Sequence, residues 1–365
     1  MYKVIIKNER FSEDKPMKLL KMISVLFTLS ILMTACNTNS NEDTQNDSER
    51  SIATSIYPIE YLVTEIAGDY VDVETIVPSG ADAHSYEPST KTMIELSSSD
   101  GFFFIGESME SFSEAMADTV QKENVELLKL AEHEPLFEDF HQGEAIEINS
   151  EDNEEHNDES EEHHDHEHEH DDAEHNHNEE HAHDESEGHH SHNHDVDPHF
   201  WLDPLRMVDA GEIVLDKLVS MYPEEEETFK QNFETFKSKM EELDEQYQES
   251  FDEEVSILVT HKSFSYIEQR YPVKQFSIRG ISSAQEPSQR ELQLLFDQIE
   301  ELHIEHIILE TSSDDRLAQT IADELGLEKY HLSNLSTRTE EEINEEKDYY
   351  DIMIDNLNVL NEINH

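Results

Sequence analysis

The chain is long and strongly acidic, and its charge narrows the partners it can have. Its 365 residues suffice for two domains of ordinary size, although only 35% of them are hydrophobic. The 88 acidic residues outnumber the 24 basic ones and give a formal net charge of -64, which argues against nucleic acid or an anionic membrane surface as a partner and favours cations. An acidic surface is also typical of proteins from salty habitats, and charge alone leaves both explanations open.

The beginning of the chain carries the pattern of a secretory signal. Lys18 and Lys21 precede a mostly apolar run at 23–33, which is shorter than the roughly 20 residues that span a bilayer. The sequence Leu-Met-Thr-Ala-Cys at 32–36 resembles a bacterial lipobox, in which the cysteine becomes the N-terminal residue after cleavage and carries the lipid. Cys36 is the only cysteine, so the chain cannot form an internal disulfide, and lipidation is the role we predict for this residue.

These signals also predict where the protein resides. Met17 is a better start than Met1, because it directly precedes the basic part of the signal. After Cys36, the residues at 37–50 are mostly polar, as in a flexible tether that holds a domain away from a membrane. We therefore predict a protein that is lipid-anchored to the extracellular face of the cell membrane of a Gram-positive bacterium.

Strand and helix patterns alternate from residue 51 onward. A short strand, an amphipathic helix that stops at Gly68 and a second strand at 71–77 have the spacing of a parallel α/β unit. The next loop, 78–88, contains His84 and lies at the carboxyl end of a strand, where open α/β sheets keep their binding sites. The remaining segments of this lobe are a serine-capped helix, a buried strand and two further elements, at 89–96, 101–106, 110–117 and 125–130.

A histidine-rich segment then interrupts the pattern. Residues 156–194 contain fourteen histidines interleaved with Asp and Glu, and their low hydrophobicity predicts a disordered loop, which we place at 142–195. Mixed imidazole and carboxylate groups form a weak, multi-site trap for zinc, copper, nickel or cobalt, whereas an ordinary acidic linker has no need of histidine. We predict accessory metal binding in the densest run, at His163, His164, His166, His168 and His170.

Helical periodicity returns after the motif DPHFWLDP at 197–204. One helix covers 207–221, Tyr222-Pro223 interrupts it, and a long charged amphipathic helix follows at 224–249. Its length suits a rigid strut between two lobes, although a helix packed along one lobe would have the same pattern. A second series of strands and helices follows at 255–260, 273–277, 291–302, 306–310, 316–325, 329–332 and 348–363.

Together these patterns predict an α/β fold of two Rossmann-like lobes. A single long rigid helix would join the lobes, and the crevice between them would hold the binding site. The predicted parts are a signal peptide with lipobox, a tether, an N-terminal lobe containing the His-rich loop, a linking helix and a C-terminal lobe, at 1–36, 37–50, 51–222, 223–250 and 251–365.

Three histidines share one setting. His84 follows a strand, His199 lies in a Pro-flanked apolar segment, and His261 directly ends a strand. A single histidine is more often structural, but three of them at strand ends or in the crevice, beside a His-rich loop, predict a metal site with fixed geometry. The other histidines outside the loop lack this setting and are taken as structural or surface residues, namely His133, His141, His303, His306, His331 and His365.

Several separated motifs occur in an order that resembles a known family. They are GADAHSYEPS at 80–89, the His-rich loop, DPHFWLDP at 197–204, VTHKSFSYIEQRY at 259–271, SAQEPSQREL at 283–292 and ILETSSDDRLAQTIADELG at 308–326. The combination resembles the zinc-binding lipoproteins among the substrate-binding components of bacterial ABC-type metal importers, a family that also holds manganese binders. The resemblance covers the chain from about residue 51 and implies two α/β lobes joined by one long helix.

The resemblance implies that His84, His199 and His261 bind one metal in the crevice for delivery to a membrane permease. Manganese members place a carboxylate at the position of His261, and imidazole suits zinc better than manganese, so the implied cargo is Zn²⁺. The family's zinc binders often supply a glutamate as fourth ligand where this chain has Ser336. Water, a loop histidine or a residue at 340–342 such as Glu340 would have to replace it.

The sequence leaves other functions to be weighed. Three histidines and a water also hold catalytic zinc, but H-E-x-x-H and comparable signatures are missing, and we do not expect an enzyme. A binder of manganese or another divalent metal, or a surface metal buffer or adhesin without a transport role, would share most of the motifs. We predict a monomer whose partners are Zn²⁺, an importer permease and, through Cys36, the membrane, and not nucleic acid.

Overall fold

The computed structural model describes residues 50–137, 196–283, 287–311 and 315–364. The chain divides into two units, Met1–Ser48 and Glu49–His365, and all described residues belong to the second. The predicted signal peptide with Cys36, nearly all of the tether and the His-rich loop with its accessory histidines lie outside the described residues. Within the described part of the chain, no helix is both long enough and apolar enough to cross a membrane.

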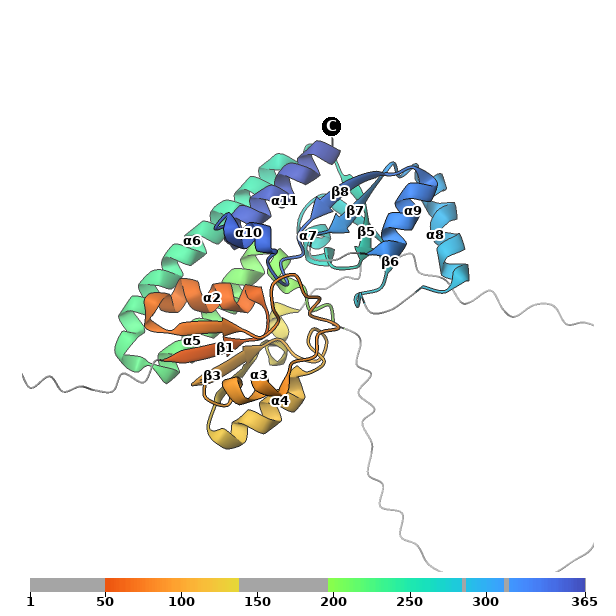
Figure 1. Ribbon diagram of the computed structural model, residues 1–365. Coiled ribbons are helices and arrows are strands. Elements are labelled where there is room, and N and C mark those ends of the chain that lie inside the picture. The colour runs from red at the N-terminus through yellow and green to blue at the C-terminus, as the bar shows by residue number, and fades with distance from the viewer. Residues whose placement is uncertain (1–49, 138–195, 284–286, 312–314, 365) are drawn as a thin grey trace, which may run out of the picture. The chain divides into compact units, whose positions relative to one another are not determined.

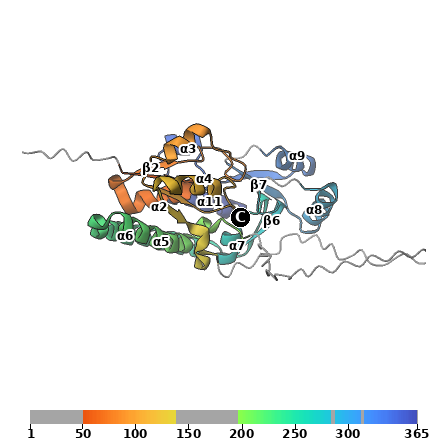
Figure 2. The same cartoon turned by 90° about the horizontal axis from the view of Figure 1, so that it is seen from below.

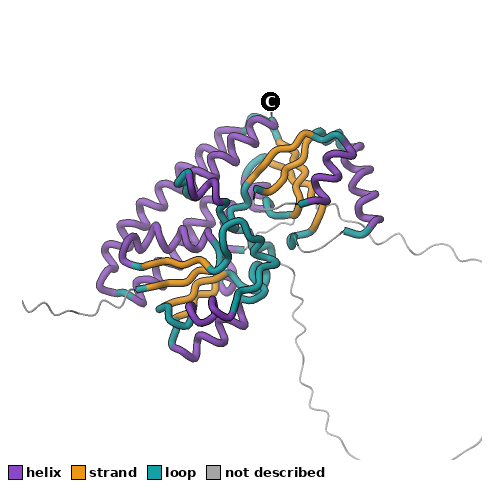
Figure 3. Tube along the Cα trace, viewed as in Figure 1, coloured by secondary structure: helices purple, strands orange, loops and turns teal. Residues whose placement is uncertain are grey.

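The first sheet contains four parallel strands in the order β2-β1-β3-β4. One of its two central strands, β3, is buried along its whole length, and the rings of Phe102 and Phe104 stack with their centroids 4.7 Å apart. Figure 3 shows the strands of the two sheets as separate groups, each with helices beside it. The elements of this part are β1 (Ser51–Thr54), α2 (Tyr57–Ala67), β2 (Asp72–Thr75), α3 (Thr90–Leu96), β3 (Gly101–Phe104), α4 (Ser113–Val120), β4 (Glu126–Lys129) and α5 (Pro204–Met221).

The second sheet also contains four parallel strands, in the order β6-β5-β7-β8. A compact apolar cluster lies between this sheet and the helices α8 and α9, and it includes Leu258, Leu295, Ile307 and Ile321. The elements are β5 (Val255–His261), α7 (Ser265–Arg270), β6 (Val273–Arg279), α8 (Gln289–Glu301), β7 (His306–Glu310), α9 (Arg316–Leu325), β8 (Glu328–Leu332), α10 (Glu340–Asn344) and α11 (Tyr349–Ile363). Two parallel-sheet α/β lobes, as predicted from the sequence, are thereby confirmed.

The longest helix of the described residues is α6 (Glu226–Ser250), whose 25 residues extend over about 37 Å. Its buried face contacts α2 and α5 of the first lobe and α11 near the C-terminus, and the hydroxyl of Tyr247 donates a hydrogen bond to the carbonyl of Met353 at 2.6 Å. Figures 1 and 2 show α5 and α11 beside this helix. A Cβ at Gly211 of α5 would lie 2.9 Å from the ring of Phe236, so glycine is needed where α5 meets α6. The boundaries of the linking helix at 223 and 250 stay a prediction.

An ion pair ties the second lobe to the long helix. Arg270, at the end of α7, donates to both carboxylate oxygens of Asp244 on α6, at 2.5 and 2.8 Å, and Tyr271 donates to the same carboxylate at 2.8 Å. Arg270 also lies 3.5 Å from Asp203, the N-cap residue of α5. This one guanidinium therefore connects α7 with both long helices.

Removing this guanidinium should destabilise the fold. We expect Arg270→Ala to lower the free energy of unfolding by about 2 kcal/mol, because it leaves the largely buried carboxylate of Asp244 without its cation. Thermal unfolding followed by circular dichroism should show a melting temperature lower by about 4–8 °C. The exposed pair between Lys230 and Glu226 on the same helix provides the control, and Lys230→Ala should cost less than about 0.5 kcal/mol. Equal losses in the two variants would contradict the assignment.

Candidate metal centre

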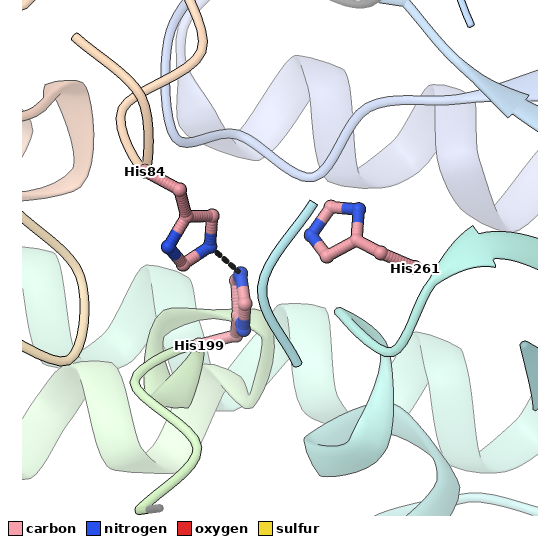
Figure 4. Close-up of side chains that lie close together, drawn as sticks. All are labelled: His84, His199 and His261. Atoms are coloured by element: carbon pink, nitrogen blue, oxygen red, sulfur yellow. Dashed lines mark hydrogen bonds between the residues drawn. The ribbon is translucent and has the colours of Figure 1, made fainter. Parts of the chain in front are cut away.

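The three histidines singled out in the sequence come together in the structure. His84 lies in the loop after β2, His199 directly precedes the short 3₁₀ helix η5 (Phe200–Leu202), and His261 is the last residue of β5. One nitrogen from each ring lies within 4.8 Å of the other two, and Figure 4 shows the rings facing one another. The ring centroids are 5.4 Å apart for His84 and His199, 5.8 Å for His84 and His261, and 5.5 Å for His199 and His261.

The loop that carries His84 is held by polar contacts on both sides of the site. The carboxylate of Asp82 accepts a hydrogen bond from the backbone N–H of His84 at 2.9 Å, and its other oxygen accepts one from the hydroxyl of Ser283, after β6, at 2.6 Å. Gly80 adopts a left-handed φ of 70°, and its N–H donates to the carbonyl of Arg338 at 3.1 Å. The loop of the first lobe thus rests on segments of the second.

Carboxylates hold the other two imidazoles. Asp197 Oδ1 accepts from both the backbone N–H and Nδ1 of His199, at 2.9 and 2.7 Å. Glu310, at the carboxyl end of β7, lies with Oε1 2.5 Å from Nδ1 of His261. Bonding of Nδ1 to a carboxylate leaves Nε2 as the free nitrogen, which is how metal-binding histidines are commonly oriented.

The free nitrogens of His84 and His199 have the spacing that a tetrahedral metal would require. Nε2 of His84 and Nε2 of His199 are 3.4 Å apart, and two nitrogens bound at about 2.0–2.1 Å to one tetrahedral zinc also lie about 3.4 Å apart. Nε2 of His261 is buried and makes no hydrogen bond to any described residue. A buried polar atom without a partner costs free energy, so this nitrogen is ready to bind a cation.

Burial and neighbouring charges give the histidines different pKa values. Burial, together with the neighbouring His199 and His261, lowers the pKa of His84 to about 2, so this imidazole is neutral. Burial alone would lower the pKa of His261 as well, but the charge and hydrogen bond of Glu310 outweigh it and raise this pKa above its usual value. The pKa of Glu310 is lowered in turn, because the interaction with His261 outweighs the effect of its burial.

The residues considered for a fourth ligand are placed differently. Ser336 is buried, and its hydroxyl donates to Oδ1 of Asn334 at 2.9 Å. Glu340 is exposed at the first position of α10, a helix that the sequence analysis did not predict, and it is not part of the histidine cluster. Among the described residues, the only group of at least three possible metal-ligand residues is formed by the three histidines.

The sequence analysis missed the carboxylates behind the imidazoles. Asp197 had a local signal, because it stands two residues before His199 in the motif at 197–204. Glu310 had none, since it meets His261 only through the pairing of β5 with β7. Asp82 stands two residues before His84, and this repeated Asp-x-His spacing could have identified both aspartates.

The fold and the site define a class of protein, a two-lobed α/β binding protein with a cluster of three imidazoles contributed by both lobes. Residues 52–363 match the family model described as "Zinc-uptake complex component A periplasmic", and the chain belongs to this family. The resemblance stated from the sequence is thereby confirmed. The family comprises metal-binding proteins of transport systems and is not a class of enzymes.

Relatives agree with this assignment. The chain is 28% identical to "Zinc-binding lipoprotein AdcA" of Streptococcus pneumoniae, over 93% of this chain and 60% of that protein, so it spans less than two thirds of that relative. It is 26% identical to "High-affinity zinc uptake system protein ZnuA" of Bacillus subtilis, over 93% of this chain and 97% of that protein. The crystal structure of the Zn(II)-bound ZnuA-like domain of Streptococcus pneumoniae AdcA matches with a TM-score of 0.61 and 25% identity, covering 87% of this chain and 99% of that domain.

Proposed function

We propose that this protein captures Zn²⁺ outside the cell and delivers it to the permease of an ABC-type importer. The observation that carries the proposal is the convergence of His84, His199 and His261, with a nitrogen of each ring within 4.8 Å of the others. The zinc-binding names of the two relatives above support the choice of cargo. Zinc is cargo on this proposal, and the protein catalyses no reaction.

The donor set favours zinc over manganese. The cluster offers three imidazole nitrogens and, among the described residues, no carboxylate oxygen, because Asp197 and Glu310 bond to the far sides of the rings. Zinc readily takes nitrogen ligands in tetrahedral geometry, whereas manganese prefers oxygen ligands. Water or a residue outside the described ranges would complete the coordination.

Release follows from the origin of the ligands. His84 and His199 belong to the predicted first lobe and His261 to the second, so a small change in the relative position of the lobes would break the site. The permease, we propose, separates the lobes when the protein docks. The lipid on Cys36 would keep a monomeric protein beside that permease on the extracellular face of the membrane.

The His-rich loop has an accessory role on this proposal. Its fourteen histidines lie in the sequence directly before His199, so weak binding at many positions would raise the zinc concentration beside the site. His163, His164, His166, His168 and His170 are the residues we propose for this capture. Tight binding itself is assigned to the three-histidine cluster.

The test is metal content in the chain without its loop. A protein of residues 37–365 that lacks 151–194 should retain one zinc per chain after dialysis and resist excess Mn²⁺, because the cluster does not involve the loop. Zinc content is measured by inductively coupled plasma mass spectrometry, and the intact chain should bind additional, weakly held zinc. If the shortened chain held no zinc while the intact chain did, the protein would be a buffer whose metal chemistry resides in the loop.

A further inference from the structure

We propose that Ser336 and Asn334 are positioning residues that hold His261 in its metal-binding orientation through Glu310. The proposal rests on the proposed function, because it assigns these residues a role in the same zinc site. Ser336 is then the first member of a hydrogen-bonded relay.

The relay consists of contacts between buried groups. Oδ1 of Asn334 accepts hydrogen bonds from the backbone N–H of Ser336 at 3.0 Å and from its hydroxyl at 2.9 Å. Nδ2 of Asn334 donates to Oε2 of Glu310 at 2.7 Å. Oε1 of Glu310 accepts from the hydroxyl of Thr260 at 2.7 Å and lies 2.5 Å from Nδ1 of His261. Asn334, Ser336, Glu310 and His261 are each at most 5% exposed.

The direction of every bond follows from the first one. A backbone N–H can only donate, so the atom of Asn334 that faces Ser336 must be the amide oxygen. The amide nitrogen of Asn334 therefore faces Glu310, whose two oxygens both act as acceptors. Nδ1 of His261 is then the donor toward Glu310, and the lone pair of the imidazole remains on Nε2, the buried nitrogen without a partner.

The same segment also reaches His199 of the first lobe through one side chain. The carbonyl of Asn334 accepts a hydrogen bond from the indole N–H of Trp201 at 2.7 Å, and the Trp201 ring lies beside His199 with a centroid distance of 5.1 Å. Between the two relay residues, Leu335 is fully buried with a left-handed φ of 57°, which is unfavourable for a residue with a side chain. One residue, Asn334, thus contacts the supports of both His261 and His199.

Exchanging the amide and the carboxylate along the relay tests its direction. In Glu310→Gln, the new amide nitrogen can face Nδ2 of Asn334, and two donors then oppose each other. It can instead face Nδ1 of His261, and this nitrogen must then accept, which places the imidazole proton on Nε2. In Asn334→Asp, two carboxylates face each other. The double variant Glu310→Gln with Asn334→Asp restores every donor and acceptor, because the carboxylate introduced at position 334 would accept from both Ser336 and the amide introduced at position 310.

Zinc affinity of the full chain, measured by competition with a fluorescent chelator, should therefore be non-additive. Each single variant should bind zinc about 10–100-fold more weakly, as is typical for groups behind metal ligands, and the double variant should bind at least about tenfold more tightly than either. A double variant as weak as the product of the two single effects would overturn the relay. Asn232→Asp, which alters an amide that bonds to the carbonyl of Ile66, is the matched control and should leave zinc affinity unchanged.

A second measurement separates this proposal from the function it rests on. Nitrogen NMR of the metal-free chain at alkaline pH should show His261 with its proton on Nδ1 in the unaltered protein and the double variant, but not in Glu310→Gln. A proton on Nε2 in the unaltered protein would overturn the relay whatever the zinc affinity. Failure of the unaltered chain to bind zinc, with the Nδ1 proton in place, would overturn the proposed function and leave the relay standing.

Discussion

Replacing His261 with alanine should weaken zinc binding by about 60- to 800-fold. Tight zinc sites bind with roughly 10–16 kcal/mol from about four ligands, so the loss of one imidazole corresponds to about 2.5–4 kcal/mol. Among the described residues, His261 is the only member of the histidine cluster that the second sheet supplies, and without it the remaining imidazoles no longer connect the two lobes. Competition with a chelator at pH 7.5 measures the effect.

Two further variants make this result interpretable. His261→Ala leaves the buried carboxylate of Glu310 without its imidazole, so the fold itself could weaken. His84→Ala removes a half-buried imidazole whose ring pairs with no carboxylate of the described residues, and it should lose zinc to a similar degree with a smaller change in melting temperature. His331→Ala, at an exposed position of β8, should bind zinc like the unaltered chain. Tight zinc binding by both site variants would place the metal elsewhere.

The elements with strong local signals were predicted with little error. The helix at 316–325 was placed correctly at both ends, because Gly326 adopts the left-handed φ of 70° that ends a helix and Asp315 accepts a hydrogen bond at its start. The strand at 306–310 was also placed correctly. Helix α10 was missed, although Thr339 and Glu342 form a capping box whose Thr-x-x-Glu spacing is visible in the sequence.

The sequence predicted those residues of the candidate site that short sequence patterns reveal, and it missed those that meet only in the folded chain. His84 and His261 follow strands of two different parallel sheets. Open parallel sheets keep their binding sites at the carboxyl ends of their strands, so the fold class predicted a place at a binding site for both. Glu310 and Asn334 depend on the pairing of β5 with β7 and on the path of the chain after β8, which no local pattern encodes. Ser336 was identified by its position in the resemblance, but its partner could be found only in three dimensions.

The affinity for zinc should fall as the pH is lowered, and the fall should begin above pH 6.5. A proton and the metal compete for the same imidazole. Glu310 raises the pKa of His261 above the ordinary histidine value, so His261 gains its proton at a higher pH than a free histidine does. His84, with a pKa of about 2, stays neutral and contributes no proton. Below the pKa of His261, the affinity should therefore fall about tenfold for each unit by which the pH is lowered, because this residue takes up one proton.

The origin of this pH dependence can be tested at Glu310. Glu310→Gln removes the charge that raises the pKa of His261, so burial should dominate and the pKa should fall. The variant binds zinc more weakly at pH 7.5 because its relay is broken, yet its affinity should stay level to lower pH than that of the unaltered chain. Chelator competition between pH 8.5 and 5.5, corrected for protonation of the chelator, gives both curves. A slope steeper than one proton would mean that His261 is not the only group whose proton competes with the metal, and an unaltered affinity down to pH 5.5 would exclude His261 as a ligand.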